Sequence, residues 1–180
     1  MIRKAVAGDR AQVLALYKLV ATIPDGLART PDEVTDDYVG GFMQKAASHG
    51  VELVWEEGGR IVGEIHASCP GIAALAHLLT DLTIAVAPDA HGRGVGRGLF
   101  QALLDQVTLN LPHIHRVELF ARVSNEKARS LYRSLGFVEE GRLRARVNNS
   151  RGIAEDDTLM GWLRPAASPI PPTTNLKETA

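Results

Sequence analysis

The sequence contains a single cysteine, Cys69, among its 180 residues, and aromatic residues make up only 5% of the chain. One cysteine excludes an intrachain disulfide framework and is typical of a protein kept in the reducing cytoplasm. Neither sign of charge is in excess, because 20 basic and 21 acidic residues leave a formal net charge of −1. Without a block of lysine or arginine, the composition gives no reason to expect nucleic acid or an anionic membrane surface as a partner.

Long apolar runs and metal-ligand patterns are also missing. No apolar stretch approaches the length of a membrane-spanning helix, and the N-terminus lacks the apolar core of a signal peptide. His113 and His115 form the only close pair of histidines, and their spacing matches no zinc pattern. We therefore predict a cytoplasmic protein that has no metal site and no membrane partner.

The length and the 45% share of hydrophobic residues are typical of one globular domain with enough chain to bury a core. We expect this domain to span residues 1–164. Residues 165–180, PAASPIPPTTNLKETA, are rich in proline and small polar side chains, which bury too little apolar surface to fold. This segment is predicted to be a disordered tail.

The spacing of apolar residues predicts an alternation of strands and helices. The predicted strands are residues 2–6, 51–55, 60–67, 75–87, 116–121, 137–147 and 157–163. Glu57-Gly58-Gly59 is typical of a hairpin turn between two of them. The predicted helices begin near residues 9, 30, 95 and 125. The second has the clearest start, Thr30-Pro31-Asp32-Glu33, which combines a capping threonine, a proline at the first helical position and a glutamate three residues after the cap.

Residues 81–104, DLTIAVAPDAHGRGVGRGLFQALL, join a predicted strand to a predicted helix through a glycine-rich turn. The first amides of a helix lack intrahelical partners and lie at the positive end of the helix dipole, so such a junction favours an anion. The glycines at 92, 94, 96 and 98 remove β-carbons that would hold an anion away from the backbone. Arg93 and Arg97 add positive charge, so we predict a phosphate cradle.

The glycine spacing excludes the two common nucleotide loops. A dinucleotide fingerprint would need its third glycine at the position of Arg97 or Leu99, and a phosphate loop would need a lysine that this run lacks. The segment His91-Gly92-Arg93-Gly94-Val95-Gly96 instead resembles the acetyl-coenzyme A signature of the GNAT superfamily of N-acetyltransferases, Gln/Arg-x-x-Gly-x-Gly/Ala. His91 departs from the usual Gln or Arg.

A second segment strengthens this resemblance. Residues 125–137, NEKARSLYRSLGF, are similar to the family's pattern Asn-x-x-Ala-x-x-x-Tyr-x-x-x-Gly-Phe at every specified position. The resemblance implies an α/β, single-domain GNAT-like fold, with a mixed, mostly antiparallel sheet of six to seven strands flanked by about four helices. Within the family, the chain is similar to the bacterial branch that acetylates amino acids, small amines or protein N-termini. It also implies acetyl-CoA as the acetyl donor, a small-molecule or peptide amine as the acceptor, and a homodimer, which is common in the family.

The resemblance further implies which residues would bind the donor. The backbone of Ile84 and Val86 would pair with the pantetheine arm, and the Val86 amide would polarise the thioester carbonyl. The remaining donor-binding residues implied by the two motifs are His91, Gly92, Arg93, Gly94, Val95, Gly96, Arg97, Asn125 and Ala128.

Two residues are implied as catalytic. Tyr132 would protonate the departing thiolate, and Asp81 lies at about the place where the family often has a glutamate base. The residues alone leave other interpretations open. By spacing, Tyr132 is a core residue of its helix, Asp81 is a turn or solvent residue, and Asn125 is a helix cap. Cys69 lies in neither motif, so direct attack in a ternary complex is expected rather than a covalent acyl-enzyme.

The acceptor is the least determined part of the hypothesis. In the resembling family, residues equivalent to 23–38 and about 142–157 shape acceptor choice. The first of these segments is acidic and would attract a cationic amine, although helix-start carboxylates explain Asp32 and Glu33 without any ligand. A rival hypothesis from another class is a non-catalytic acyl-CoA sensor or interaction module that keeps the cradle.

Overall fold

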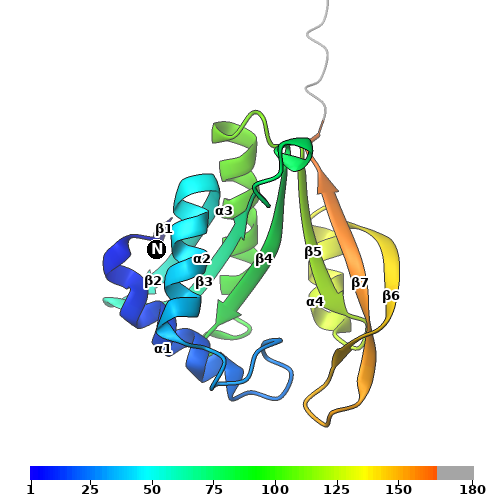
Figure 1. Cartoon of the computed structure of the whole chain (residues 1–180). Helices are drawn as coiled ribbons and strands as arrows, with labels where there is room; N and C mark the ends of the chain where they lie inside the picture. The colour runs from blue at the N-terminus through cyan, green and yellow to red at the C-terminus, as the bar shows by residue number, and fades with distance from the viewer. Residues whose placement is uncertain (166–180) are drawn as a thin grey trace, which may run out of the picture.

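Seven strands form one mixed sheet through the middle of the molecule (Figure 1). The structure is a computed structural model and describes residues 1–165, so the predicted tail lies, apart from Pro165, outside the described residues. The strands are β1 (Ile2–Lys4), β2 (Gly50–Glu57), β3 (Arg60–Ser68), β4 (Leu78–Val86), β5 (Arg116–Arg122), β6 (Val138–Asn148) and β7 (Ala154–Leu163). Their order is β1-β2-β3-β4-β5-β7-β6, and only the β4–β5 pair is parallel. The mixed, mostly antiparallel sheet is confirmed.

Two helices lie on each face of the sheet (Figure 1). The helices are α1 (Arg10–Ala21), α2 (Asp36–His49), α3 (Val95–Asn110) and α4 (Glu126–Ser134). The alternation of β3 separates the faces, since Glu64 and His66 contact side chains of α1 and α2. A β-carbon added to Gly63, which shares the face of Ile65, would meet Val95 and Leu99 of α3. The predicted order of strands and helices is therefore confirmed.

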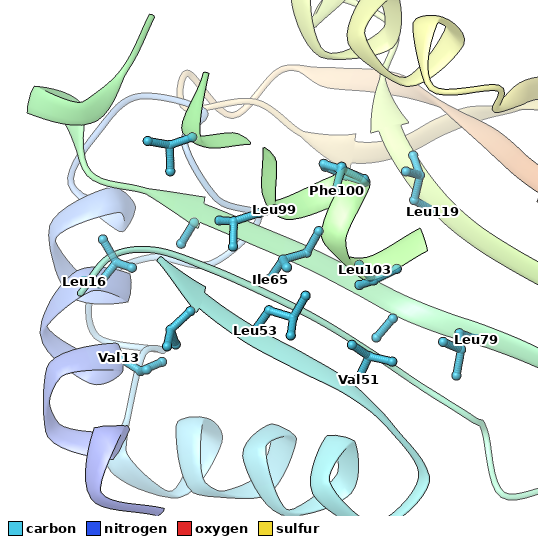
Figure 2. Packing of buried hydrophobic residues seen from close by; sticks show 14 of the residues in the cluster. Val13, Leu16, Val51, Leu53, Ile65, Leu79, Leu99, Phe100, Leu103 and Leu119 are labelled. Atoms are coloured by element: carbon cyan, nitrogen blue, oxygen red, sulfur yellow. The ribbon is translucent and has the colours of Figure 1, made fainter. Parts of the chain in front are cut away.

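Part of the buried core lies between the sheet and α3. Leu53 and Ile65 are register partners on β2 and β3, and they belong to one buried cluster with Leu99 and Leu103 of α3 (Figure 2). Each of these side chains is at most 2% exposed. Full burial of a leucine or isoleucine contributes roughly 1.5–3 kcal/mol, so this layer fixes α3 and the turn that precedes it.

The start of α2 differs from the prediction. Thr30 and Glu33 do bond as a capping pair, with the Thr30 N–H donating to Glu33 Oε2 at 2.8 Å, but they close only a single turn. Val34 then leaves helical geometry to bury its side chain, which is 1% exposed. The helix begins after Thr35, whose hydroxyl accepts the Tyr38 N–H at 3.1 Å. Packing of Val34 thus moved the helix cap five residues, from Thr30 to Thr35.

β4 and β5 are paired only where they begin. Leu78 and Leu79 are in register with Arg116 and Val117, and beyond these positions the two strands diverge (Figure 1). On its other edge β4 stays paired with β3 as far as Val86. Beyond Leu79, this edge of β4 therefore has no strand partner among residues 1–165, and the opening positions the site. The strand is shorter than the predicted 75–87, because residues 73–75 form a 3-10 turn.

Candidate active site

A cavity of about 1240 Å³ lies where β4 and β5 separate. Its lining comes from β4, the glycine turn, α4 and β5, together with the segment between α1 and α2 and the β6–β7 hairpin. Segments that are far apart in the sequence thus share one space. A cavity of this size can hold an extended ligand and a second small molecule together.

The free edge of β4 presents backbone groups to this cavity. The Ala87 N–H donates to Val62 O at 2.9 Å, which makes these two residues a hydrogen-bonded pair of the β3–β4 ladder. Because such pairs alternate in an antiparallel ladder, Ile84 and Val86 turn their N–H and C=O groups away from β3. These groups are where the sequence predicted that the pantetheine arm would pair.

The glycine turn has the geometry of an anion cradle. Gly92 and Gly94 adopt left-handed φ values of 75° and 83°, and Gly94 directly precedes the first residue of α3. A β-carbon at either position would project into open space, so packing does not require these glycines. They allow the left-handed backbone and the close approach of an anion to it. Gly98 differs, because a β-carbon there would lie 2.6 Å from the Trp55 ring. Gly98 is therefore a packing position and not part of the cradle.

His91 has a definite role in this turn. Its Nε2 lies 3.0 Å from the carbonyl oxygen of Val86, so the imidazole joins the turn to the end of β4. The contact ties the predicted phosphate and pantetheine segments to each other. The departure from the usual Gln or Arg leaves a hydrogen-bonding side chain in place.

The two arginines of the turn point to different surroundings. Arg97 lines the cavity and donates to Ser134 Oγ at 2.7 Å. Arg93 does not line the cavity, because its guanidinium pairs with Glu57 at 2.9 Å on the β2–β3 hairpin. The predicted contact of the Arg93 side chain with phosphate is at odds with this placement. The pairing partner is remote in sequence, so the motif could not indicate it.

α4 brings three predicted residues to the opposite wall. Asn125 caps the helix, its Oδ1 accepting the Ala128 N–H at 3.1 Å, and both residues line the cavity. Tyr132 also lines the cavity, packed on Phe100 with ring centroids 4.9 Å apart. Its hydroxyl makes no hydrogen bond to any of residues 1–165. Burial raises the pKa of Tyr132 to about 12, so the phenol keeps its proton at neutral pH.

Asp81 lies on a bulge of β4. The register with β3 shifts here, and Asp81 adopts a left-handed φ of 54°. Such a bulge re-aims a side chain, and a non-glycine residue in this region is held there by its surroundings. The carboxylate lines the cavity, is 63% exposed and lies 2.7 Å from Lys45 Nζ. The predicted base is thus an exposed, ion-paired group.

The two segments predicted to shape acceptor choice do meet. Asp25 accepts the Ser150 N–H at 2.8 Å and pairs with Arg122, which joins the α1–α2 segment to the β6–β7 turn. The acidity of the first segment is partly neutralised, because Asp25 is paired with Arg122 and Asp36 with Arg10. Glu33 is hydrogen-bonded to Thr30, which leaves its negative charge in place. The predicted attraction for a strongly cationic acceptor is therefore reduced.

A buried polar group was missed by the sequence analysis. Glu64 is 0% exposed, accepts a hydrogen bond from the Tyr17 hydroxyl at 2.5 Å and lies 3.1 Å from His66 Nδ1. His66 lines the cavity. The signal was the alternation Glu64-Ile65-His66 inside an otherwise apolar strand, which places two polar side chains on one buried face.

Other candidate chemistries find no matching arrangement within residues 1–165. No group of three or more His, Cys, Asp or Glu side chains in this range is placed to hold a metal ion. Cys69 does not line the cavity, and burial raises the pKa of its thiol. In the same range no helix has both the length and the apolar character needed to cross a membrane.

Comparison with known families decides the identity. Residues 48–139, 92 of the 180, match the family model described as an acetyltransferase (GNAT) domain. The chain belongs to the GNAT acetyltransferases. The matched segment contains both the glycine turn and α4, which are the elements that carried the resemblance in the sequence.

Individual relatives of this GNAT protein agree with the fold. A GNAT-family acetyltransferase from Streptococcus pneumoniae superimposes with a TM-score of 0.83 at 24% identity, covering 91% of this chain and 99% of that one. A putative acetyltransferase from Salmonella typhimurium, solved with its cofactor acetyl-CoA, gives 0.75 at 20% identity over 95% and 98% of the two chains. Spermidine N(1)-acetyltransferase of Vibrio cholerae is 37% identical over 67 residues, which span 37% of this chain and only 38% of that protein.

Proposed function

We propose that this GNAT protein is an acetyl-CoA-dependent N-acetyltransferase that moves the acetyl group to a primary amine by direct attack in a ternary complex. The observation that carries the proposal is the cavity, because the free edge of β4, the glycine cradle and the unpartnered Tyr132 hydroxyl surround one space. Acetyl-CoA would supply a thioester whose acyl carbon accepts the amine. The remaining work falls to residues of this chain.

The donor-binding residues fit an extended ligand that ends in phosphates. The left-handed Gly92 and Gly94 leave the start of α3 open to an anion, and Arg97 adds a cation at the cavity wall. Ile84 and Val86 offer strand-like backbone pairing along the β4 edge. In this proposal the Val86 N–H also stabilises the negative charge that develops on the carbonyl oxygen.

Tyr132 is proposed as the general acid. Its raised pKa, about 12, keeps the proton available at any pH the enzyme meets, and its hydroxyl is free of protein partners within residues 1–165. The phenol would protonate the sulfur as the C–S bond breaks. General acids of this kind contribute about 10²–10⁴-fold to the rate.

The acceptor is proposed to be a small-molecule or peptide amine with little net positive charge beyond the reacting nitrogen. Four carboxylates line the cavity, and three of them are paired, Asp25 with Arg122, Asp81 with Lys45 and Asp157 with Arg146. Among the described residues that line the cavity, Asp37 is the carboxylate left without an ion pair for a polycation to contact. The partial relative from Vibrio cholerae acts on spermidine by name, so spermidine belongs among the amines to be tested.

Thiol release from acetyl-CoA tests the proposal. Purified protein is assayed with amino acids, small amines, spermidine and N-terminal peptides, and Tyr132→Phe is assayed with the best acceptor. We expect turnover with a small amine and a loss of about 10²–10⁴-fold in kcat for the variant. Acetyl-CoA affinity, measured by calorimetry, should stay unchanged. Tight acetyl-CoA binding with no turnover across the panel would instead favour the non-catalytic acyl-CoA sensor.

Cytoplasmic location and a homodimer are also part of this proposal. The first rests on the single cysteine and the second on the family resemblance. Light scattering of the purified protein, with and without acetyl-CoA, measures the oligomeric state directly.

A further inference from the structure

Glu64 carries a fully buried carboxylate on β3. It is 0% exposed and has no lysine or arginine partner within residues 1–165. Burying a carboxylate is costly unless hydrogen bonds compensate. The compensation comes from the Tyr17 hydroxyl, at 2.5 Å, and from His66 Nδ1, at 3.1 Å. The fold thus keeps a polar group at a buried position of β3, where an apolar side chain would cost less to bury.

His66 connects this buried pair to the cavity. Its ring stacks on Phe42 with a centroid distance of 3.9 Å and an interplanar angle of 10°, so its orientation is fixed. Nδ1 is committed to Glu64, which leaves Nε2 as the second nitrogen. Nε2 makes no hydrogen bond to any described residue, and the side chain lines the same cavity as Tyr132.

The groups around His66 favour a proton-accepting role. Glu64 lies on its own strand, Glu52 of β2 is its register partner, and Tyr17 reaches it from α1. Burial and Glu64 hold the pKa of Tyr17 well above its ordinary value, so Tyr17 remains a donor to Glu64. Burial raises the pKa of Glu52 to about 8. On the cavity side, Tyr38, Lys45 and Asp81 are among the titratable residues of the lining that His66 shares.

Asp81 is less suited than His66 to accept the proton of the acceptor. Its carboxylate is 63% exposed and already paired with Lys45. An imidazole, with an ordinary pKa near ~6.5, is better matched to accepting a proton near neutral pH. A carboxylate behind it fixes the tautomer and stabilises the imidazolium that forms.

We propose that His66 is the general base of this site, with Nε2 taking the proton of the acceptor ammonium directly or through one water. This rests on the proposed function. Glu64 and Tyr17 act as positioning residues, Glu64 by holding Nδ1–H and Tyr17 by holding Glu64. His66 thus takes the role of base that the family resemblance implied for Asp81.

The proton and bond changes balance. His66 takes one proton from the ammonium and later releases it to solvent. The freed amine nitrogen bonds to the acyl carbon, the C–S bond breaks, and Tyr132 protonates the leaving thiolate. The second proton on the new amide nitrogen returns to Tyr132 through water, so that one proton leaves for each acetyl group transferred.

The test compares three variants of the full chain. His66→Gln keeps a hydrogen-bonding group but cannot titrate, Glu64→Gln removes the anion behind the ring, and Asp81→Asn removes the competing base. We expect His66→Gln to lower kcat by about 10²–10⁴-fold and to abolish the acid limb of the kcat–pH profile. Glu64→Gln should move that limb to lower pH, and Asp81→Asn should leave its position unchanged. Acetyl-CoA affinity should be the same in all four proteins.

The outcomes separate this inference from the proposed function. If the wild-type protein turns over an amine and His66→Gln keeps both its kcat and its acid limb, His66 is not the base. Loss of the limb in Asp81→Asn alone would return the role to Asp81. No turnover by the wild-type protein overturns the two proposals together. If His66→Gln does not fold, Tyr17→Phe is measured in its place. An unshifted acid limb in Tyr17→Phe then overturns the proposal that Tyr17 and Glu64 act on His66 as the base.

Discussion

The carboxylate of Asp25 accepts the backbone N–H of Ser150 at 2.8 Å across 125 residues of sequence. Asp25 also pairs with Arg122, and both side chains line the cavity. Asp25 adopts a left-handed φ of 60°, which asparagine also tolerates. The pair thus connects the two segments that the family resemblance implied to shape acceptor choice.

Asp25→Asn should raise the KM for the acceptor and lower kcat/KM. Displacement of the bound substrate by a shifted cavity wall can lower the rate by up to about 10²-fold, even when the catalytic groups are intact. Steady-state kinetics with the best amine measure the effect, and calorimetry should give an unchanged affinity for acetyl-CoA. The matched control is Asp32→Asn, since Asp32 lies in the same segment but outside the cavity lining. Equal effects of the two substitutions on the KM for the acceptor would contradict a role for the Asp25 contacts in acceptor binding.

Arg97 and Arg93 should differ in their effect on the donor. Arg97→Ala removes a cation from the cavity wall, and the loss of a charge-assisted bond should weaken acetyl-CoA binding by roughly tenfold or more. Arg93→Ala removes a side chain that pairs with Glu57 outside the cavity and should leave the affinity unchanged. Calorimetry at two salt concentrations measures both variants. A salt-sensitive loss of acetyl-CoA affinity in Arg93→Ala would instead show that the Arg93 side chain contacts the phosphates.

Substitutions at Gly94, which caps α3, and at Gly98, inside α3, should separate acetyl-CoA binding from stability. Gly94→Ala puts a β-carbon on a residue with φ of 83° and should cost about 1–2 kcal/mol, together with at least part of the acetyl-CoA affinity. Gly98→Ala places a β-carbon 2.6 Å from Trp55 and should cost about 1–3 kcal/mol of stability without changing the affinity. Urea unfolding and calorimetry give the two quantities. The cradle assignment fails if Gly98→Ala is the variant that loses affinity.

Glu52 should make stability depend on pH. Burial raises its pKa from 4.5 to about 8, so between these values the folded state holds a proton that the unfolded state has lost. The stabilisation by this proton is therefore fully present below pH 4.5 and is lost as the pH rises toward 8. Over this range the free energy of unfolding falls by up to about 1.4 kcal/mol per pH unit. Glu52→Gln should flatten this decline.

Thermal melting at pH 5 and pH 8 measures the Glu52 effect. We expect the variant to match the wild-type protein at pH 5 and to melt at a higher temperature at pH 8. Glu33→Gln is the control, because a backbone hydrogen bond from Thr30 lowers the pKa of that exposed carboxylate. Parallel curves for Glu52→Gln and the wild-type protein would show that Glu52 is ionised in the fold at neutral pH.

Several features were determined by the sequence alone, because their causes are local. The buried stripe of α1 follows from helical spacing, and it consists of Val13, Leu16, Tyr17 and Val20. The hairpin at Gly58-Gly59 follows from two residues that accept left-handed φ values. The glycine turn and the segment from Asn125 to Phe137 indicated the family for the same reason, since each motif is read within a few residues.

Other features were decided only by the tertiary structure. Packing of Val34 moved the start of α2, and pairing with Glu57 turned Arg93 away from the cavity. The bulge at Asp81 depends on its register with β3. His66 acquires a role only because α1 and α2 close over the face of the sheet that carries Glu64. In each case the deciding contact joins residues far apart in the chain, and the spacing of nearby residues contains no information about such contacts.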